Sequence, residues 1–196
     1  MIEVLRAPHV APTPRKLFES MNAQTIERFA CGATQIEAYK SSNTLKVEAY
    51  NAQTDSKHQV HMAAYLHDMP MGFDIPAKSR LLHLSLSTAN RLALDPLASP
   101  YFRAGEFVTT AIEHFDSMGR IEYCEGQWYV GTNHDAFFQA LGQGAPEHVA
   151  AASTWTGAQL ARHGFELHPD NVRIIDSPRQ GPSGCRVFVL FHRTSS

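Results

Sequence analysis

The stretch Leu92–Gly119 holds residues whose spacing could bind an anion. Leu92–Leu94 are expected to form a short apolar strand, and a turn-rich loop then leads to an amphipathic helix that ends at Gly119. Ser99 is the expected helix cap and Pro100 the first helical residue. A strand, a loop and a helix N-terminus in this order present free backbone N–H groups to an anion. The sequence therefore predicts an anion-binding loop in front of this helix.

His83 offers acid–base chemistry on an expected strand. The segment His83-Leu84-Ser85-Leu86 resembles the H-x-[ST]-φ motif of two-histidine phosphoesterases, and His192-Arg193-Thr194 offers a second, shorter copy. In that chemistry one histidine acts as the acid and the other as the base. The chain contains 11 His residues, so a strand histidine that is hydrogen-bonded in or beside the core is the alternative interpretation.

The cysteines and the remaining histidines do not indicate a metal site. Cys31, Cys124 and Cys185 are odd in number and lack CxxC spacing, which argues against a disulfide framework and a structural zinc site. We interpret them as reduced thiols of a cytoplasmic protein. His61 and His67 share one face of an expected strand but lie about 20 Å apart. No metal is therefore expected.

The composition is that of a globular protein with a full core, since 43% of the residues are hydrophobic. A net charge of −2 gives no support for nucleic acid or a charged membrane surface as the main partner. The N-terminal residues lack the pattern of a signal peptide, and no apolar run is long enough to span a membrane. The expected partner is a small-molecule substrate, and a homodimer is left open.

Hydrophobic spacing and turn residues predict the elements that position these groups. The expected strands are 1–7, Ile36–Tyr39, Leu45–Tyr50, Gln59–His67, Leu81–Ser87, Leu92–Leu94, Ile121–Cys124, Gln127–Val130, Asn171–Ile175 and Cys185–His192. The expected helices run from Pro14, with Thr13 as the cap, to about Ala30, from Pro100 to Gly119, over Asn133–Leu141, and from Pro146 to Gly164 with Val149, Ala152, Thr156 and Leu160 inward. Residues 45–67 are expected to form a hairpin, and Glu125-Gly126 a tight turn.

Runs of strands broken by single helices predict an α+β fold with a central twisted mixed sheet flanked by helices. A length of 196 residues predicts a single domain over residues 1–196. Within it, residues 1–40 form an N-terminal strand and helix, residues 44–131 the central sheet, and residues 133–193 the C-terminal helices and closing strands.

This order of elements resembles the GNAT fold of acyl-CoA-dependent N-acyltransferases, and two stretches carry the resemblance. The segment LALDP, with the loop and helix up to Gly119, is similar to the family's fourth strand, pyrophosphate loop and third helix. The segment LARHGFELHPDNVRIIDSP, with RVFVLFHR, is similar to the family's helix that ends in a GF pair and its two closing strands. The family's glycine-rich loop corresponds to Ser99–Ala104, where only Ala104 fits. A non-catalytic binding or regulatory domain is therefore the alternative.

The resemblance implies transfer of an acyl group from acyl-CoA or acetyl-CoA to a small amine. The implied cofactor-binding residues are Leu92, Leu94, Phe102, Arg103, Ala104, Gly105 and Asn133. His83 and Glu48, on central strands, are the base candidates, and Tyr129 and His134 follow the fifth strand, where the family often keeps its acid. Strands 92–94 and 127–130 are expected to be parallel neighbours that splay apart to admit the pantetheine arm.

Overall fold

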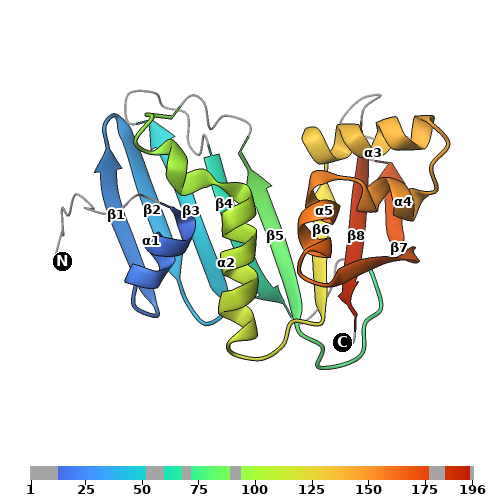
Figure 1. Cartoon of the computed structure of the whole chain (residues 1–196), viewed down its shortest axis with the longest axis horizontal. Coiled ribbons are helices and arrows are strands. Elements are labelled where there is room, and N and C mark those ends of the chain that lie inside the picture. The colour runs from blue at the N-terminus through green and yellow to red at the C-terminus, as the bar shows by residue number, and fades with distance from the viewer. Residues whose placement is uncertain (1–12, 52–59, 68–71, 89–93, 177–183, 195–196) are drawn as a thin grey trace. The chain divides into compact units, whose positions relative to one another are not determined.

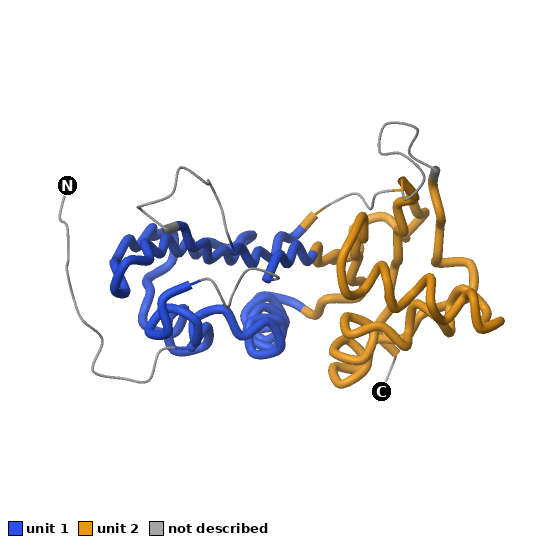
Figure 2. The backbone as a smooth tube through the Cα atoms, turned by 90° about the horizontal axis from the view of Figure 1, so that it is seen from above, with its two compact units in different colours: residues 1–66, 84–119 blue, residues 67–83, 120–196 orange. Residues whose placement is uncertain are grey.

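The computed structural model describes residues 13–51, 60–67, 72–88, 94–176 and 184–194. The expected strand over residues 1–7 and the expected site residue Leu92 lie outside these ranges. Contacts group the chain into two compact units, coloured separately in Figure 2. The first unit consists of residues 1–66 and 84–119, and the second of residues 67–83 and 120–196. The single domain expected over the whole chain stays a prediction.

The first unit packs helices against one face of antiparallel strands (Figure 1). Its elements are α1 (Pro14–Ser20), β1 (Thr25–Cys31), β2 (Thr34–Lys40), β3 (Thr44–Asn51), most of β4 (Val60–His67), the second half of β5 (Leu81–Ser87), the 3-10 helix η2 (Ser99–Phe102) and α2 (Ala104–Asp116). Alternate strand residues such as Ile36, Val47 and Met62 are buried, as the period of two for a half-buried strand requires. The rings of Phe18 and Phe107, with centroids 6.0 Å apart, join α1 to α2.

The second unit contains the C-terminal half of the chain together with the first residues of β5. Its further elements are β6 (Tyr123–Trp128), α3 (Thr132–Gly142), α4 (Glu147–Ala152), α5 (Trp155–Ala161), β7 (Phe165–Asp176) and β8 (Cys185–Arg193). Trp128 on β6 packs against Phe137 on α3, with ring centroids 6.1 Å apart. A second cluster is formed by Phe73, Leu81 and Leu190. The first contact holds α3 against β6. The second holds the loop that precedes β5 against β5 and β8.

The sheet is mixed, which confirms the expected α+β class. Its eight strands follow the order β1-β2-β3-β4-β5-β6-β8-β7. The ladders β1–β2, β2–β3, β3–β4, β6–β8 and β7–β8 are antiparallel, whereas β5 and β6 run parallel. The β3–β4 ladder confirms the hairpin expected over residues 45–67, and β8 lies between β6 and β7. Of the helices in the described ranges, none is both long enough and apolar enough to span a bilayer.

The first helix begins as predicted but ends ten residues early. The Thr13 side chain accepts a hydrogen bond from the Lys16 backbone N–H at 3.3 Å, and Pro14 opens α1. The chain then turns at Gln24, whose φ of 60° no helix can continue. Residues 25–31 form β1 instead of helix, and all seven pair with β2. The helical spacing that continues to Phe29 is therefore overridden by strand pairing.

The two strands expected around Glu125-Gly126 are one continuous strand, β6. Both neighbours pair through the expected turn: Glu125 lies opposite His83 of β5 and opposite Leu190 of β8. The packing around Gly126 is close, because a Cβ at this position would lie 3.3 Å from the Val189 side chain. Backbone pairing on both sides thus outweighs the local Glu-Gly turn preference.

The helix expected from Pro146 to Gly164 is divided into α4 and α5. Thr154 caps α5 by accepting a hydrogen bond from the Gly157 N–H at 3.1 Å. The division rotates the buried face, so Val149 and Ala152, which were expected inward, are exposed and Ala150 and Ala151 are buried instead. Thr156 and Leu160 are buried as predicted. Beyond α5, Gly164 has a φ of 77° and Phe165 is buried behind it.

We expect Gly157→Ala to destabilise the second unit by about 1–3 kcal/mol, as overpacking does. A Cβ at Gly157 would lie 2.4 Å from the Ala152 carbonyl oxygen, and a backbone atom cannot move aside as a side-chain tip can. Gly142→Ala is the matched control, because nothing lies within 4 Å of a Cβ there. Urea unfolding of both variants measures the difference. Equal stability of the two would contradict the tight α4–α5 corner.

His114, near the end of α2, is a titratable group whose protonation affects the stability of the first unit. Its Nε2 lies 3.1 Å from the Ser41 carbonyl oxygen. Burial lowers the pKa of His114; the hydrogen bond to Ser41 opposes this shift, and the charge of Lys40 adds to it. The folded protein therefore favours the neutral imidazole, which donates to Ser41.

The pH dependence follows from the direction of that shift. The unfolded chain has the higher His114 pKa, about 6.5, so the stabilising contribution of this group is complete above that value and is lost as the pH falls below it. We expect His114→Gln, which keeps a donor but cannot ionise, to show a smaller loss of unfolding free energy on acidification. Urea titrations of both proteins across this range measure it. An unchanged slope would show that His114 is not responsible.

Candidate functional site

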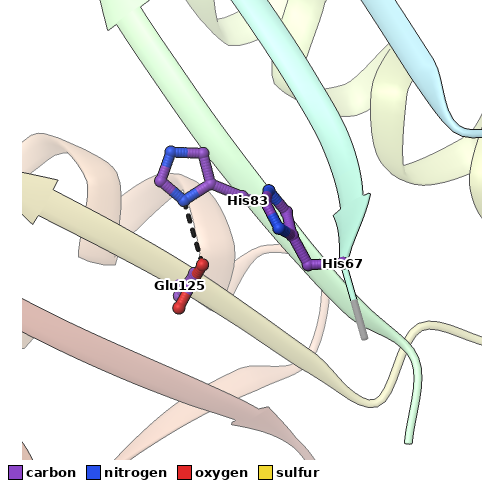
Figure 3. A group of neighbouring side chains, drawn as sticks. All are labelled: His67, His83 and Glu125. Carbon is purple, nitrogen blue, oxygen red and sulfur yellow. Dashed lines mark hydrogen bonds and ion pairs between the residues drawn. The ribbon is translucent and has the colours of Figure 1, made fainter. Parts of the chain in front are cut away.

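His83 and Glu125 form a buried acid–base pair across parallel strands of the second unit. The register of β5 and β6 places the two residues opposite each other. His83 Nδ1 lies 3.1 Å from Glu125 Oε1, and the Glu125 side chain is only 4% exposed. Figure 3 shows the imidazole directed at the carboxylate. Because backbone pairing fixes both Cα atoms, the geometry of this pair does not depend on long, mobile side chains.

His67, the last residue of β4, lies beside this pair. Its ring centroid is 5.4 Å from that of His83, and the two rings are tilted by 68° (Figure 3). One candidate ligand atom from each of His67, His83 and Glu125 lies within 4.8 Å of the others. His67 is exposed, whereas Glu125 is buried. The group is therefore anchored at its carboxylate and open to solvent at His67.

The electrostatics around Glu125 keep the neighbouring cysteine inert. Burial raises the pKa of the Cys124 thiol far above its ordinary value, and the Glu125 carboxylate raises it further. The pKa of Cys31 in the first unit is also raised, by burial and by Asp95. Both groups remain neutral thiols near pH 7, and a neutral thiol is a poor nucleophile. The pair of His83 and Glu125 is thus a better candidate for catalysis than either cysteine.

Glu48, the second expected base, has a different environment. Its carboxylate lies 2.6 Å from Lys46 Nζ, and its neighbour across the β3–β4 ladder is His61. His61 Nε2 in turn lies 3.1 Å from Ser85 Oγ. These residues belong to the first unit. A carboxylate that neutralises a lysine is a weaker base candidate than a histidine held by a buried carboxylate.

Tyr129, Asn133 and His134 are engaged in packing within the second unit. The Tyr129 hydroxyl donates to Gln127 Oε1, and Tyr129 follows Glu125 by four positions, about 13 Å along an extended chain. Asn133 bonds the Thr156 side chain and N–H, and so ties α3 to α5. His134 is buried, with Nε2 3.2 Å from the Cys185 carbonyl oxygen. The structure does not bring Tyr129 to His83, and the roles predicted for these three residues stay predictions.

The expected anion-binding loop has a different structure from the one predicted. Leu94 lies in a bend rather than a strand, and the parallel neighbour of β6 is β5. Ser99 is not a cap but the first residue of η2, and no side chain caps η2 or α2. Arg103 is extended and interrupts the helix, so that α2 begins at Ala104.

Several predicted cofactor-binding residues still surround the start of α2. Phe102 is buried, Arg103 is exposed, and Ala104 and Gly105 are partly exposed. The first intrahelical bond of this turn is donated by the Phe107 N–H to the Arg103 carbonyl oxygen. The preceding amides, which an α-helix cannot satisfy internally, are positioned for an external acceptor.

His192 lies on β8, two strands away from His83 on β5. The β6–β8 register places His192 opposite Tyr123, whereas His83 lies opposite Glu125. With strands about 4.8 Å apart and a rise of about 3.4 Å per residue, the two backbones are separated by about 12 Å. The two-histidine phosphoesterase interpretation, which needs these side chains in one cleft, stays a prediction.

We expect His83→Ala to lower the unfolding free energy by about 1.5–3 kcal/mol, because it removes a hydrogen bond to a buried carboxylate. Adding Glu125→Gln to this variant is expected to recover part of the loss, since a neutral amide is less costly to bury than a carboxylate. A double-mutant cycle by urea unfolding measures the coupling. Additive effects of the two changes would contradict a direct interaction.

Comparison with protein-family models, with curated proteins and with solved structures found no match for this chain. The function is therefore inferred from the site itself. The residues that carry that inference are His83 and Glu125 on the parallel strands β5 and β6.

Proposed function

We propose that this protein is an acyl-CoA-dependent N-acyltransferase of GNAT-like fold. The order of elements supports the proposal: β5 leads through α2 to the parallel strand β6, and α5 leads through Gly164-Phe165 to the closing strands β7 and β8. On these strands, β5 takes the part that the sequence suggested for residues 92–94. The strand proposed to correspond to the family's fourth strand is therefore β5, and it is still followed by a helix, α2, and a parallel strand, β6.

The pair of His83 and Glu125 is the observation that carries the proposal. With its Nδ1 proton donated to Glu125, His83 presents Nε2 as a proton acceptor, and the carboxylate stabilises the imidazolium that forms. Such a pair serves transfer to an amine, which attacks as the neutral free base and gives up a proton as the C–N bond forms. The amine nitrogen bonds to the thioester carbonyl carbon, its proton moves to His83 Nε2, and the C–S bond breaks. The departing thiolate then takes up a proton to give free CoA.

Binding of the cosubstrate is assigned to the start of α2 in the first unit. The first-turn amides of residues 104–106, which have no acceptor within the helix, and the guanidinium of Arg103 would offer positive charge to a pyrophosphate. The family's loop glycines are absent, which limits how closely the backbone can approach a phosphate. Arg103 provides a full charge in place of that close approach.

The proposal predicts release of free CoA when the protein is mixed with acetyl-CoA or a longer acyl-CoA and a panel of small amines. His83→Gln is expected to lower kcat by about 10²–10⁴, the usual contribution of a general base, with little change in the KM for acyl-CoA. Arg103→Ala is expected to raise that KM by about tenfold or more, because it removes a charge-assisted contact to phosphate. A thiol-reactive dye measures both constants.

His168→Gln is the matched control, because His168 lies on β7 beside Asp170 and is exposed. We expect its kinetics to equal those of the unaltered protein. Thermal unfolding with millimolar acyl-CoA provides a second measurement, and an increase in Tm is expected. No increase in Tm and no CoA release would reject the transferase and favour a non-catalytic domain of the same fold.

A further inference from the structure

We propose that His67, His83 and Glu125 form a binding site for a divalent transition-metal ion of the zinc type. The three side chains come from consecutive strands of the sheet order, β4, β5 and β6 (Figure 3). All three belong to the second unit. The sequence does not predict this site, because His67 and His61 on the same strand lie too far apart, and the ligands of the group come from three different strands.

The distances within the group fit a common ion. Zn²⁺ lies about 2.0–2.1 Å from histidine nitrogen, so two ligands of one tetrahedral ion are about 3.3 Å apart. His83 Nδ1 and Glu125 Oε1 are already 3.1 Å apart. The widest separation in the group, within 4.8 Å, requires a ring movement of up to about 1.5 Å. His67 is exposed at the end of its strand, so its side chain has room for that movement.

The charge at Glu125 favours a cation at this position. A carboxylate that is 4% exposed has lost most of its hydration, and burial of an ion is costly unless an opposite charge compensates for it. A dication bound to Glu125 supplies that compensation directly. Glu125 is also fixed on both sides by β5 and β8, so one ligand of the site is held in place before the ion arrives.

The donor set predicts which ions bind. Two imidazoles and one carboxylate are ligands typical of Zn²⁺ sites with an open position, and also of Fe²⁺ and Co²⁺ sites. Mg²⁺ and Ca²⁺ prefer oxygen ligands throughout. We therefore expect Zn²⁺ and Co²⁺ to bind and Mg²⁺ to bind far more weakly.

Metal binding and proton acceptance exclude each other at His83. A metal on Nδ1 leaves the ring proton on Nε2, which removes the acceptor that the proposed acyl transfer requires. Bound Zn²⁺ is therefore expected to inhibit that transfer. This consequence rests on the proposed function, whereas the metal site itself does not.

Direct binding to the full-length protein tests the site without reference to activity. The protein is freed of metal with a chelator, transferred to buffer, and titrated with CoCl₂ and ZnCl₂ by calorimetry, with the visible absorption of Co²⁺ as a second readout. We expect one ion per chain and an absorption stronger than that of the hydrated ion. His67→Ala is expected to weaken binding at least about tenfold, since even residues that only orient a ligand contribute that much.

His168→Ala is the matched control, since it removes an exposed histidine that also lies beside a carboxylate in the second unit. Its affinity for Co²⁺ is expected to be unchanged. Circular dichroism of the His67→Ala variant confirms its folding, and Glu125→Gln provides an independent loss of a ligand. The proposal is overturned if the unaltered protein binds Co²⁺ no better than the His67→Ala variant, if His168→Ala weakens binding equally, or if MgCl₂ binds as tightly as CoCl₂.

Discussion

The second unit must compensate for the buried carboxylate of Glu125, whose side chain is 4% exposed. A charge in the middle of a strand, with strands on both sides, must be compensated within the sheet. His83 provides that compensation from the parallel strand, at 3.1 Å. The register of three parallel residue pairs between β5 and β6 fixes this contact. The chemistry proposed for the protein therefore depends on backbone pairing and not on a flexible loop.

The two proposed kinds of chemistry share one arrangement of side chains, and the occupant of His83 Nδ1 would decide between them. A proton on Nδ1, shared with Glu125, leaves Nε2 to accept a second proton. A metal ion on Nδ1 uses the same carboxylate and adds His67 as a third ligand. The buried, neutral Cys124 thiol next to Glu125 has a pKa too high for it to compete in either role.

The sequence predicts the elements correctly where local signals agree with the tertiary contacts, as at the Thr13-Pro14 helix start, in the β3–β4 hairpin and in β5. It failed where tertiary contacts override a local preference: Ile26 and Phe29 continue a helical spacing but lie in β1, and Glu125-Gly126 has the composition of a turn but lies within β6. The strand motif identified His83. Glu125 was missed because it was interpreted as a turn residue, although the apolar residues on both sides of it permit one buried strand.

The position of the proton on the His83 ring shows whether Glu125 holds this histidine as a base. Long-range ¹H–¹⁵N correlation spectra of the metal-free protein identify the tautomer of each histidine, and the spectrum of His83→Gln assigns the signals of His83. We expect the proton on Nδ1 and a nitrogen shift that changes in Glu125→Gln. A proton on Nε2 in the metal-free protein, or signals that do not respond to Glu125→Gln, would contradict a His83 base held by Glu125.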